Sequence, residues 1–202
     1  HEPGVPLQLD KNLMYVWVDL AGGAAGPWVR DLLPNRAALE AKGVPMLRGL
    51  VDAWRLRHAA EAAMKLTDDR YGRGAFVVFT ADGRLYAAGR PNDNEWEAYE
   101  VGRWQASGRA AGAPSYTYVN PRLVERLISL PGVSGGVEVV ALPASPPDVP
   151  PLLLRYAVTL PAGRREVEVY YEPPRESQGG IPSDVINRIT SGRSEEGEAV
   201  AA

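Results

Sequence analysis

The longest regular hydrophobic pattern in the chain covers residues 45–66. Its apolar and weakly polar side chains recur at steps of three and four residues, which is the spacing of one face of an α-helix. They are Leu47, Val51, Trp54, His58 and Ala62. Pro45 suits the first turn of a helix, because its missing N–H would have no partner there. The pattern therefore predicts one long helix against which the rest of the chain packs.

Alternating patterns predict strands on both sides of this helix. Asp82-Gly83 separates two apolar runs, 75–80 and 84–88, and predicts a tight hairpin because Gly accepts positive φ. A second hairpin is predicted from 152–160 and 165–171. Further strands are expected at 14–20, 116–119 and 137–142, and shorter helices at 28–33, 36–42, 95–105, 122–130 and after Ser183.

These elements predict an α+β fold with a mostly antiparallel sheet and one long helix packed on a face. The length of 202 residues suits one core. We expect an extended N-terminal arm over 1–12, a single domain over 13–172 and a C-terminal arm or tail over 173–202, because both ends lack a core pattern. Chain ends of this composition become ordered by contact with another molecule. The arms are therefore expected to contact neighbouring subunits.

Charge and composition limit the classes of function. A net charge of −3 gives no general attraction to phosphate, so nucleic acid is not expected as the main partner. The absence of cysteine removes disulfides, thiolate nucleophiles and Cys-ligated metals. No apolar run reaches the length of about 18 residues that a membrane helix needs, so no transmembrane segment is expected. No cofactor is expected, and the chain is more easily interpreted as a non-enzymatic protein.

A carboxylate at the end of a strand is the first candidate for chemistry. Asp19 follows an apolar strand and precedes a Gly-rich loop, where α/β enzymes often place a metal-binding or nucleophilic carboxylate. Four acidic residues further along could complete the site of a metal-dependent hydrolase, namely Asp93, Glu95, Glu97 and Glu100. The alternative is that Asp19 caps backbone N–H groups and that the others form a solvated acidic face.

The two histidines are a second candidate. An N-terminal histidine can bind copper through its amino group and ring, and His58 could add a third nitrogen to His1. The alternative places His58 on the apolar side of the long helix as a hydrogen-bonded core or boundary residue.

An aromatic and arginine cluster is the candidate for binding. Trp96, Tyr99, Arg103 and Trp104 are the residue types that dominate binding hot spots. Core packing is the alternative for the aromatic members. We assign this set as an interaction site, and we assign no catalytic residue and no metal ligand.

Residues 76–85 read Phe-Val-Val-Phe-Thr-Ala-Asp-Gly-Arg-Leu. With the order of elements over residues 45–171, this segment resembles extracytoplasmic sensor domains of the PAS or Cache type. The resemblance implies a ligand pocket between sheet and helix. Three hypotheses result. The first is a non-enzymatic interaction or assembly subunit in a homo- or hetero-oligomer, the second is a small-molecule sensor domain, and the third is a carboxylate-dependent metal hydrolase around Asp19.

Overall fold

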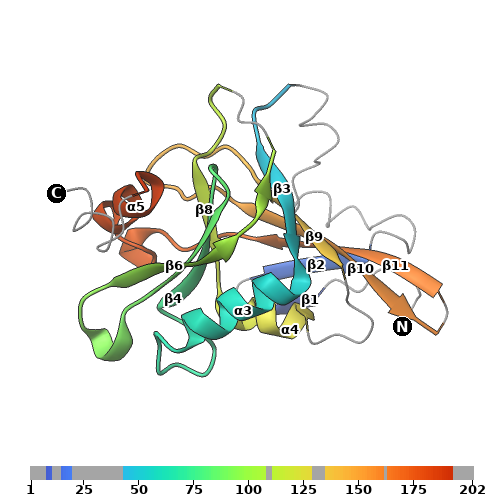
Figure 1. Cartoon of the computed structure of the whole chain (residues 1–202), viewed down its shortest axis with the longest axis horizontal. Helices are drawn as coiled ribbons and strands as arrows, with labels where there is room; N and C mark the ends of the chain where they lie inside the picture. The colour runs from blue at the N-terminus through green and yellow to red at the C-terminus, as the bar shows by residue number, and fades with distance from the viewer. Residues whose placement is uncertain are drawn as a thin grey trace.

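The structure is a computed structural model that describes residues 8–10, 15–19, 43–107, 111–128, 135–161 and 163–192. In these residues it contains two antiparallel sheets and three α-helices, which confirms the predicted α+β class. The strands form two sheets rather than one. Figure 1 shows the helices α3 and α4 next to each other at one end of the molecule and α5 on the outer side of one sheet.

Sheet A has seven strands in the order β1-β2-β11-β10-β9-β3-β7. β10 and β11 form the second predicted hairpin, and β2 confirms the strand predicted at 14–20. β1 lies in the predicted N-terminal arm but pairs with β2, so this part of the arm belongs to a sheet. The strands are β1 (Gln8–Asp10), β2 (Tyr15–Asp19), β3 (Leu47–Asp52), β7 (Gln105–Ala106), β9 (Gly136–Ala141), β10 (Leu152–Leu160) and β11 (Gly163–Tyr171).

Sheet B has four strands in the order β6-β5-β4-β8. They are β4 (Ala75–Thr80), β5 (Arg84–Gly89), β6 (Glu97–Arg103) and β8 (Tyr116–Val119). The predicted hairpin at Asp82-Gly83 is confirmed, and Gly83 has the positive φ, 87°, that this turn needs. Every residue of β4 and β5 is buried, because other elements cover both faces of this sheet.

The main core lies between the two sheets and the helices α3 (Ala53–Met64) and α4 (Pro121–Ile128). Val77 and Phe79 of sheet B face this core, together with Val139 and Leu154 of sheet A. α4 begins as predicted, because the side-chain oxygen of Asn120 accepts hydrogen bonds from the backbone N–H groups of residues 122 and 123.

The helix predicted over 45–66 was wrong in its first part. Residues 47–52 form strand β3, which alternates between buried and exposed positions and pairs with β9, and the helix begins only at Ala53. The predicted buried face was wrong as well, because Trp54 and His58 point to solvent. The helix instead buries Leu56 and four alanines, Ala53, Ala59, Ala60 and Ala63, in the main core.

The C-terminal segment is folded against sheet B as far as residue 192, so in this part the expected arm is wrong. Helix α5 (Ser183–Thr190) buries Val185, Ile186 and Ile189 on the outer face of the sheet, where Phe76 and Tyr118 lie. The Tyr118 hydroxyl donates to the carbonyl of Pro174 and accepts from the N–H of Ile181. Two short 3₁₀ turns, η2 (Pro91–Asp93) and η3 (Glu176–Gln178), complete the described elements.

The segment 95–105, predicted to be a short helix, instead contains β6 and the first residue of β7. Leu85 and Tyr86 of β5 pair with Gly102 and Glu100 of β6, so Val101 is an extra residue and forms a bulge. The bulge breaks the alternation that would have indicated a strand. After Trp104 the chain leaves sheet B and continues as β7 beside β3 of sheet A. The helices predicted at 28–33 and 36–42 lie outside the described residues.

Candidate functional site

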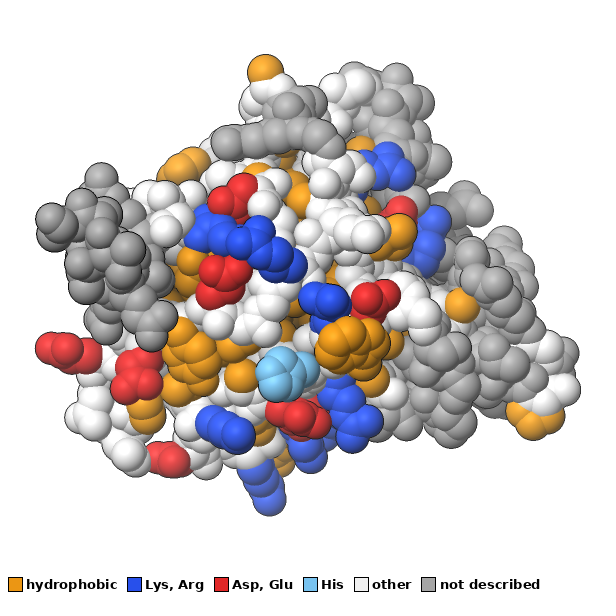
Figure 2. Space-filling model, viewed as in Figure 1, with side chains coloured by type: hydrophobic (Ala, Val, Ile, Leu, Met, Phe, Trp, Pro, Cys, Tyr) orange, Lys and Arg blue, Asp and Glu red, His pale blue; other side chains and the backbone are white. Residues whose placement is uncertain are grey.

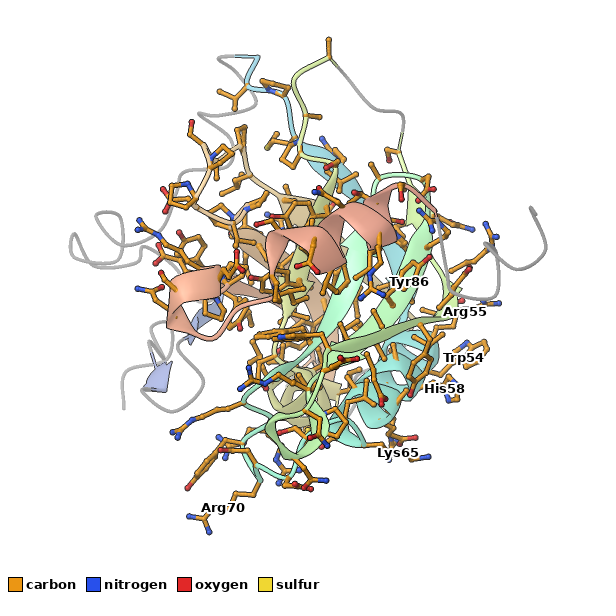
Figure 3. The ribbon with its side chains drawn as sticks, turned by 90° about the vertical axis from the view of Figure 1, so that its left-hand side faces the viewer. Trp54, Arg55, His58, Lys65, Arg70 and Tyr86 are labelled. Atoms are coloured by element: carbon orange, nitrogen blue, oxygen red, sulfur yellow. The ribbon has the colours of Figure 1, made fainter. Side chains whose placement is uncertain are left out.

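The outward side of α3 carries the most exposed large apolar side chain of the described residues. Trp54 is 65% exposed, although burial of a tryptophan is usually favourable. Four exposed residues follow one line along this side of the helix, at steps of four, three and four residues, and we call them the α3 stripe: Trp54, His58, Glu61 and Lys65. In Figure 3, Trp54, His58 and Lys65 project from the same side of the helix into solvent.

The cations beside Trp54 are paired with acids. The Arg55 guanidinium lies 4.9 Å from the centre of the Trp54 ring, in cation–π geometry, and its Nε is 3.5 Å from the Asp52 carboxylate. Further along the same helix, the Nε atom of Arg57 is 3.3 Å from Oε1 of Glu61. Figure 2 shows blue and red side chains interspersed around His58 in pale blue, and no field of a single charge. The surface of α3 is therefore close to neutral and holds an aromatic ring.

Tyr99 of β6 adds a second exposed aromatic side chain on the same side of sheet B. It pairs with Ala87 of β5, and because directly paired residues share a face, Tyr99 points to the side where Ala87 contacts the core under α3. Tyr99 is 41% exposed. We call the surface formed by Trp54, Arg55, His58 and Tyr99 the α3–β6 face. It combines aromatic and arginine side chains, which are the types enriched at binding hot spots.

The four residues assigned as an interaction site do not form one surface. Tyr99 and Arg103 are exposed, and Arg103 lies 3.7 Å from Glu100. Trp96 is partly buried on the other face of sheet B, where its ring stacks on Phe76. Trp104 is 5% exposed and its indole N–H donates to the carbonyl of Thr80, so its ring belongs to the core.

Trp54 was missed because its spacing from Leu47 and Val51 placed it on the predicted core face. The run of small residues at 59, 60 and 63 was a usable signal for the true buried face, since alanines allow a helix to lie close to a sheet.

The outer edge of β6 is a poor template for the addition of another strand. Val101 bulges out of the ladder, and Glu97, Glu100 and Arg103 place charges along the strand. Bulges and charges are the features with which proteins protect exposed sheet edges. Contacts at this side of the molecule are therefore expected from side chains rather than from backbone pairing.

The hydrolase hypothesis gains no cluster of ligands from the residues that the structure describes. Among them, no group of three or more His, Asp or Glu side chains could hold a metal ion. The backbone of Asp19 pairs with Val167 within sheet A. His1 lies outside the described residues, and His58 is exposed on α3 instead of lying on a core face, which corrects that expectation.

The sensor hypothesis required a pocket behind the 76–88 hairpin. One face of this hairpin packs in the main core and the other is covered by α5. A small apolar cavity of about 10 Å³, with room for about one water molecule, lies elsewhere, between α3, α4 and sheet A. It is lined by Leu56, Val124, Leu127, Ile128, Val137, Leu154 and Tyr156.

Among the helices that the structure describes, none has the length and hydrophobicity that a membrane-spanning helix needs.

The ion pair between Arg84 and Asp82 is connected to the C-terminal segment. Arg84 is almost fully buried and donates to the Asp82 carboxylate, the Tyr86 hydroxyl and the carbonyl of Ile189 at the end of α5. Burial alone would raise the pKa of Asp82, but hydrogen bonds from Arg84 and Thr80 outweigh it and hold this pKa below its ordinary value. Burial raises the pKa of Tyr118, whose hydroxyl is already bound to the same segment.

No protein-family model matches this sequence, and no curated protein matches it. Solved structures that resemble this one include the DNA polymerase sliding clamp from Pseudomonas aeruginosa, at 17% identity and a TM-score of 0.46. The beta subunit from DNA polymerase of Streptococcus pyogenes has 16% identity and a TM-score of 0.48, and Caulobacter crescentus pol III beta has 17% and 0.47. The match covers 76–80% of this chain but only 35–39% of those three chains.

Proposed function

We propose that this chain is a non-enzymatic protein-interaction or assembly subunit that docks on a protein partner through the α3–β6 face. The exposure of Trp54, with Tyr99 on the same side of the sheet, carries the proposal. A tryptophan buries about 150–250 Å² and apolar burial contributes about 25 cal/mol per Å². Covering the exposed two thirds of Trp54 would therefore add about 3 kcal/mol to binding, which is the magnitude of a hot spot.

The charges of this face favour a protein over nucleic acid. A surface that binds phosphate needs several cations that are free to approach it. Here Arg55 and Arg57 face Asp52 and Glu61 at ion-pair distance, and Arg103 faces Glu100. An aromatic centre with a mixed, neutral surround is typical of protein interfaces. The contribution of the predicted arms to assembly stays a prediction, since residues 1–7, 11–12 and 193–202 of these arms lie outside the described part of the chain.

Site-specific photo-crosslinking in the cells that produce this chain tests the proposal. A benzophenone amino acid replaces Trp54 in one variant and Tyr99 in a second, and a control variant carries it at Arg73, in the loop that follows α3. We expect discrete protein adducts from positions 54 and 99 that are missing from position 73. Adducts that nuclease removes, or equal yields at all three positions, would refute a protein-docking role for this face.

A further inference from the structure

The α3 stripe is complementary to a second copy of itself in the antiparallel direction, because unlike side chains of the two copies then face each other. Trp54 and Lys65 are its outer members, and His58 and Glu61 are its inner members. The steps of four, three and four residues are those of the contact positions of two helices that pack side by side. If two copies of α3 pack antiparallel about a two-fold axis that passes between Ala59 and Ala60, each outer member lies opposite the other outer member of the second copy. Each inner member likewise lies opposite the other inner member.

Resting on the proposed function, we propose that the occupant of this face is a second copy of the chain, with α3 packed antiparallel on α3 of its partner. In this arrangement Trp54 lies opposite Lys65 of the partner subunit, and His58 lies opposite Glu61 of the partner subunit. The first pair is a cation–π contact and the second is a hydrogen-bonded acid–imidazole contact. Both pairs form twice because the interface is isologous.

The flanking positions of α3 are compatible with the same axis. Arg57 comes opposite the partner's Ala62, and Arg55 comes opposite the partner's Met64, so neither arginine has a like charge directly opposite it across the axis. Antiparallel packing also sets the N-terminal end of each helix beside the C-terminal end of the other, which is favourable for the helix dipoles. A parallel arrangement would instead place Lys65 against Lys65 and Glu61 against Glu61.

The size of the contact predicts a weak dimer. α3 has 12 residues and is therefore about 18 Å long, and one exposed helix face with the neighbouring Tyr99 stays below the roughly 1,200 Å² of a standard interface. We expect a dissociation constant on the order of 10–100 μM. The chain is then a monomer when dilute and a dimer when concentrated or when other contacts hold two copies together.

Sedimentation velocity on the full chain between about 1 μM and 1 mM measures this equilibrium directly. Wild type is expected to shift from monomer to dimer across the range. Trp54→Lys places lysine opposite Lys65 of the partner subunit and should weaken dimerisation at least tenfold. The double variant Trp54→Lys, Lys65→Trp restores both pairs with their members exchanged and should recover the dimer. Arg73→Glu, a charge reversal outside the stripe, should leave it unchanged.

Circular dichroism of each variant verifies that the fold is retained, which we expect because both substituted side chains are exposed. A wild-type chain that remains monomeric to 1 mM, or a double variant as weak as the single one, overturns the second-copy proposal. If position 54 still gives adducts with a different protein in cells, docking through this face stands and only the identity of the occupant is wrong. Binding of labelled duplex DNA that Trp54→Lys abolishes, without self-association, overturns both.

Discussion

The close approach of α3 to sheet B leads to a sharp prediction for Gly89. A methyl group added to Gly89 would lie 2.5 Å from Leu66 Cβ and 2.8 Å from the Leu66 carbonyl oxygen, with Ala75 Cβ at 3.3 Å. Carbon atoms in contact are about 3.5–4.0 Å apart, so the overlap with Leu66 is about 1 Å or more. Leu66 is buried and its Cβ and carbonyl belong to the rigid part of the residue, so the turn that follows α3 must shift to remove the overlap.

We therefore expect Gly89→Ala to lower the free energy of unfolding by about 1–3 kcal/mol, the usual cost of overpacking a core. Gly102→Ala in the neighbouring strand is the matched control, because its added methyl would meet only Leu85 Cδ1 at 3.6 Å, an ordinary contact. The control should change the same quantity by less than about 0.5 kcal/mol.

Urea unfolding followed by circular dichroism gives both values, provided that the slope with denaturant is the same in all three proteins. A loss in Gly89→Ala no larger than in Gly102→Ala would refute the close seating of α3 against this sheet.

Two further predictions concern the C-terminal segment and the ion pair between Asp82 and the buried Arg84. Ile189→Ala should cost about 2–5 kcal/mol in urea unfolding, because the Ile189 side chain is fully buried between α5 and sheet B, and a cost below about 1 kcal/mol would show that α5 is not part of the cooperative fold. The lowered pKa of Asp82 stabilises the fold above the ordinary carboxyl pKa of 3.8 and loses this effect as pH falls through the lower, folded value. Asp82→Asn should therefore lose less unfolding free energy than wild type between pH 7 and pH 3, and equal losses in both proteins would contradict this role.

The sequence correctly predicted those elements whose formation depends on residues adjacent in the chain. The Asp82-Gly83 turn needs only a glycine with positive φ, and the start of α4 needs only Asn120 next to Pro121. Both hairpins and this helix were correct for that reason. The division of 45–66 into β3 and α3 depends on pairing with β9, which lies far away in the chain. A spacing that fits a helix and a strand equally well could not reveal it.

The candidate site was only partly accessible from the sequence. Tyr99 was predicted to be an interaction residue, which stays a prediction, and the exposed Trp54 was wrongly assigned to the core. The error arose because a large aromatic ring was given more weight than Ala59 and Ala60, while the structure buries the alanines and leaves the ring in solvent. Trp104 was predicted to be an interaction residue, but the structure buries it. Its burial results from the passage of the chain from sheet B to sheet A at this residue.

That passage at Trp104 has a mechanical consequence. One continuous segment is hydrogen-bonded to β5 on one side of Trp104 and to β3 on the other, so the two sheets are joined by main chain as well as by their shared side chains. Gly49 of β3 leaves the space that the Trp104 ring and β7 need. A load applied to β6 by a bound neighbour would therefore pass along the backbone of residues 97–106 into β3 of sheet A.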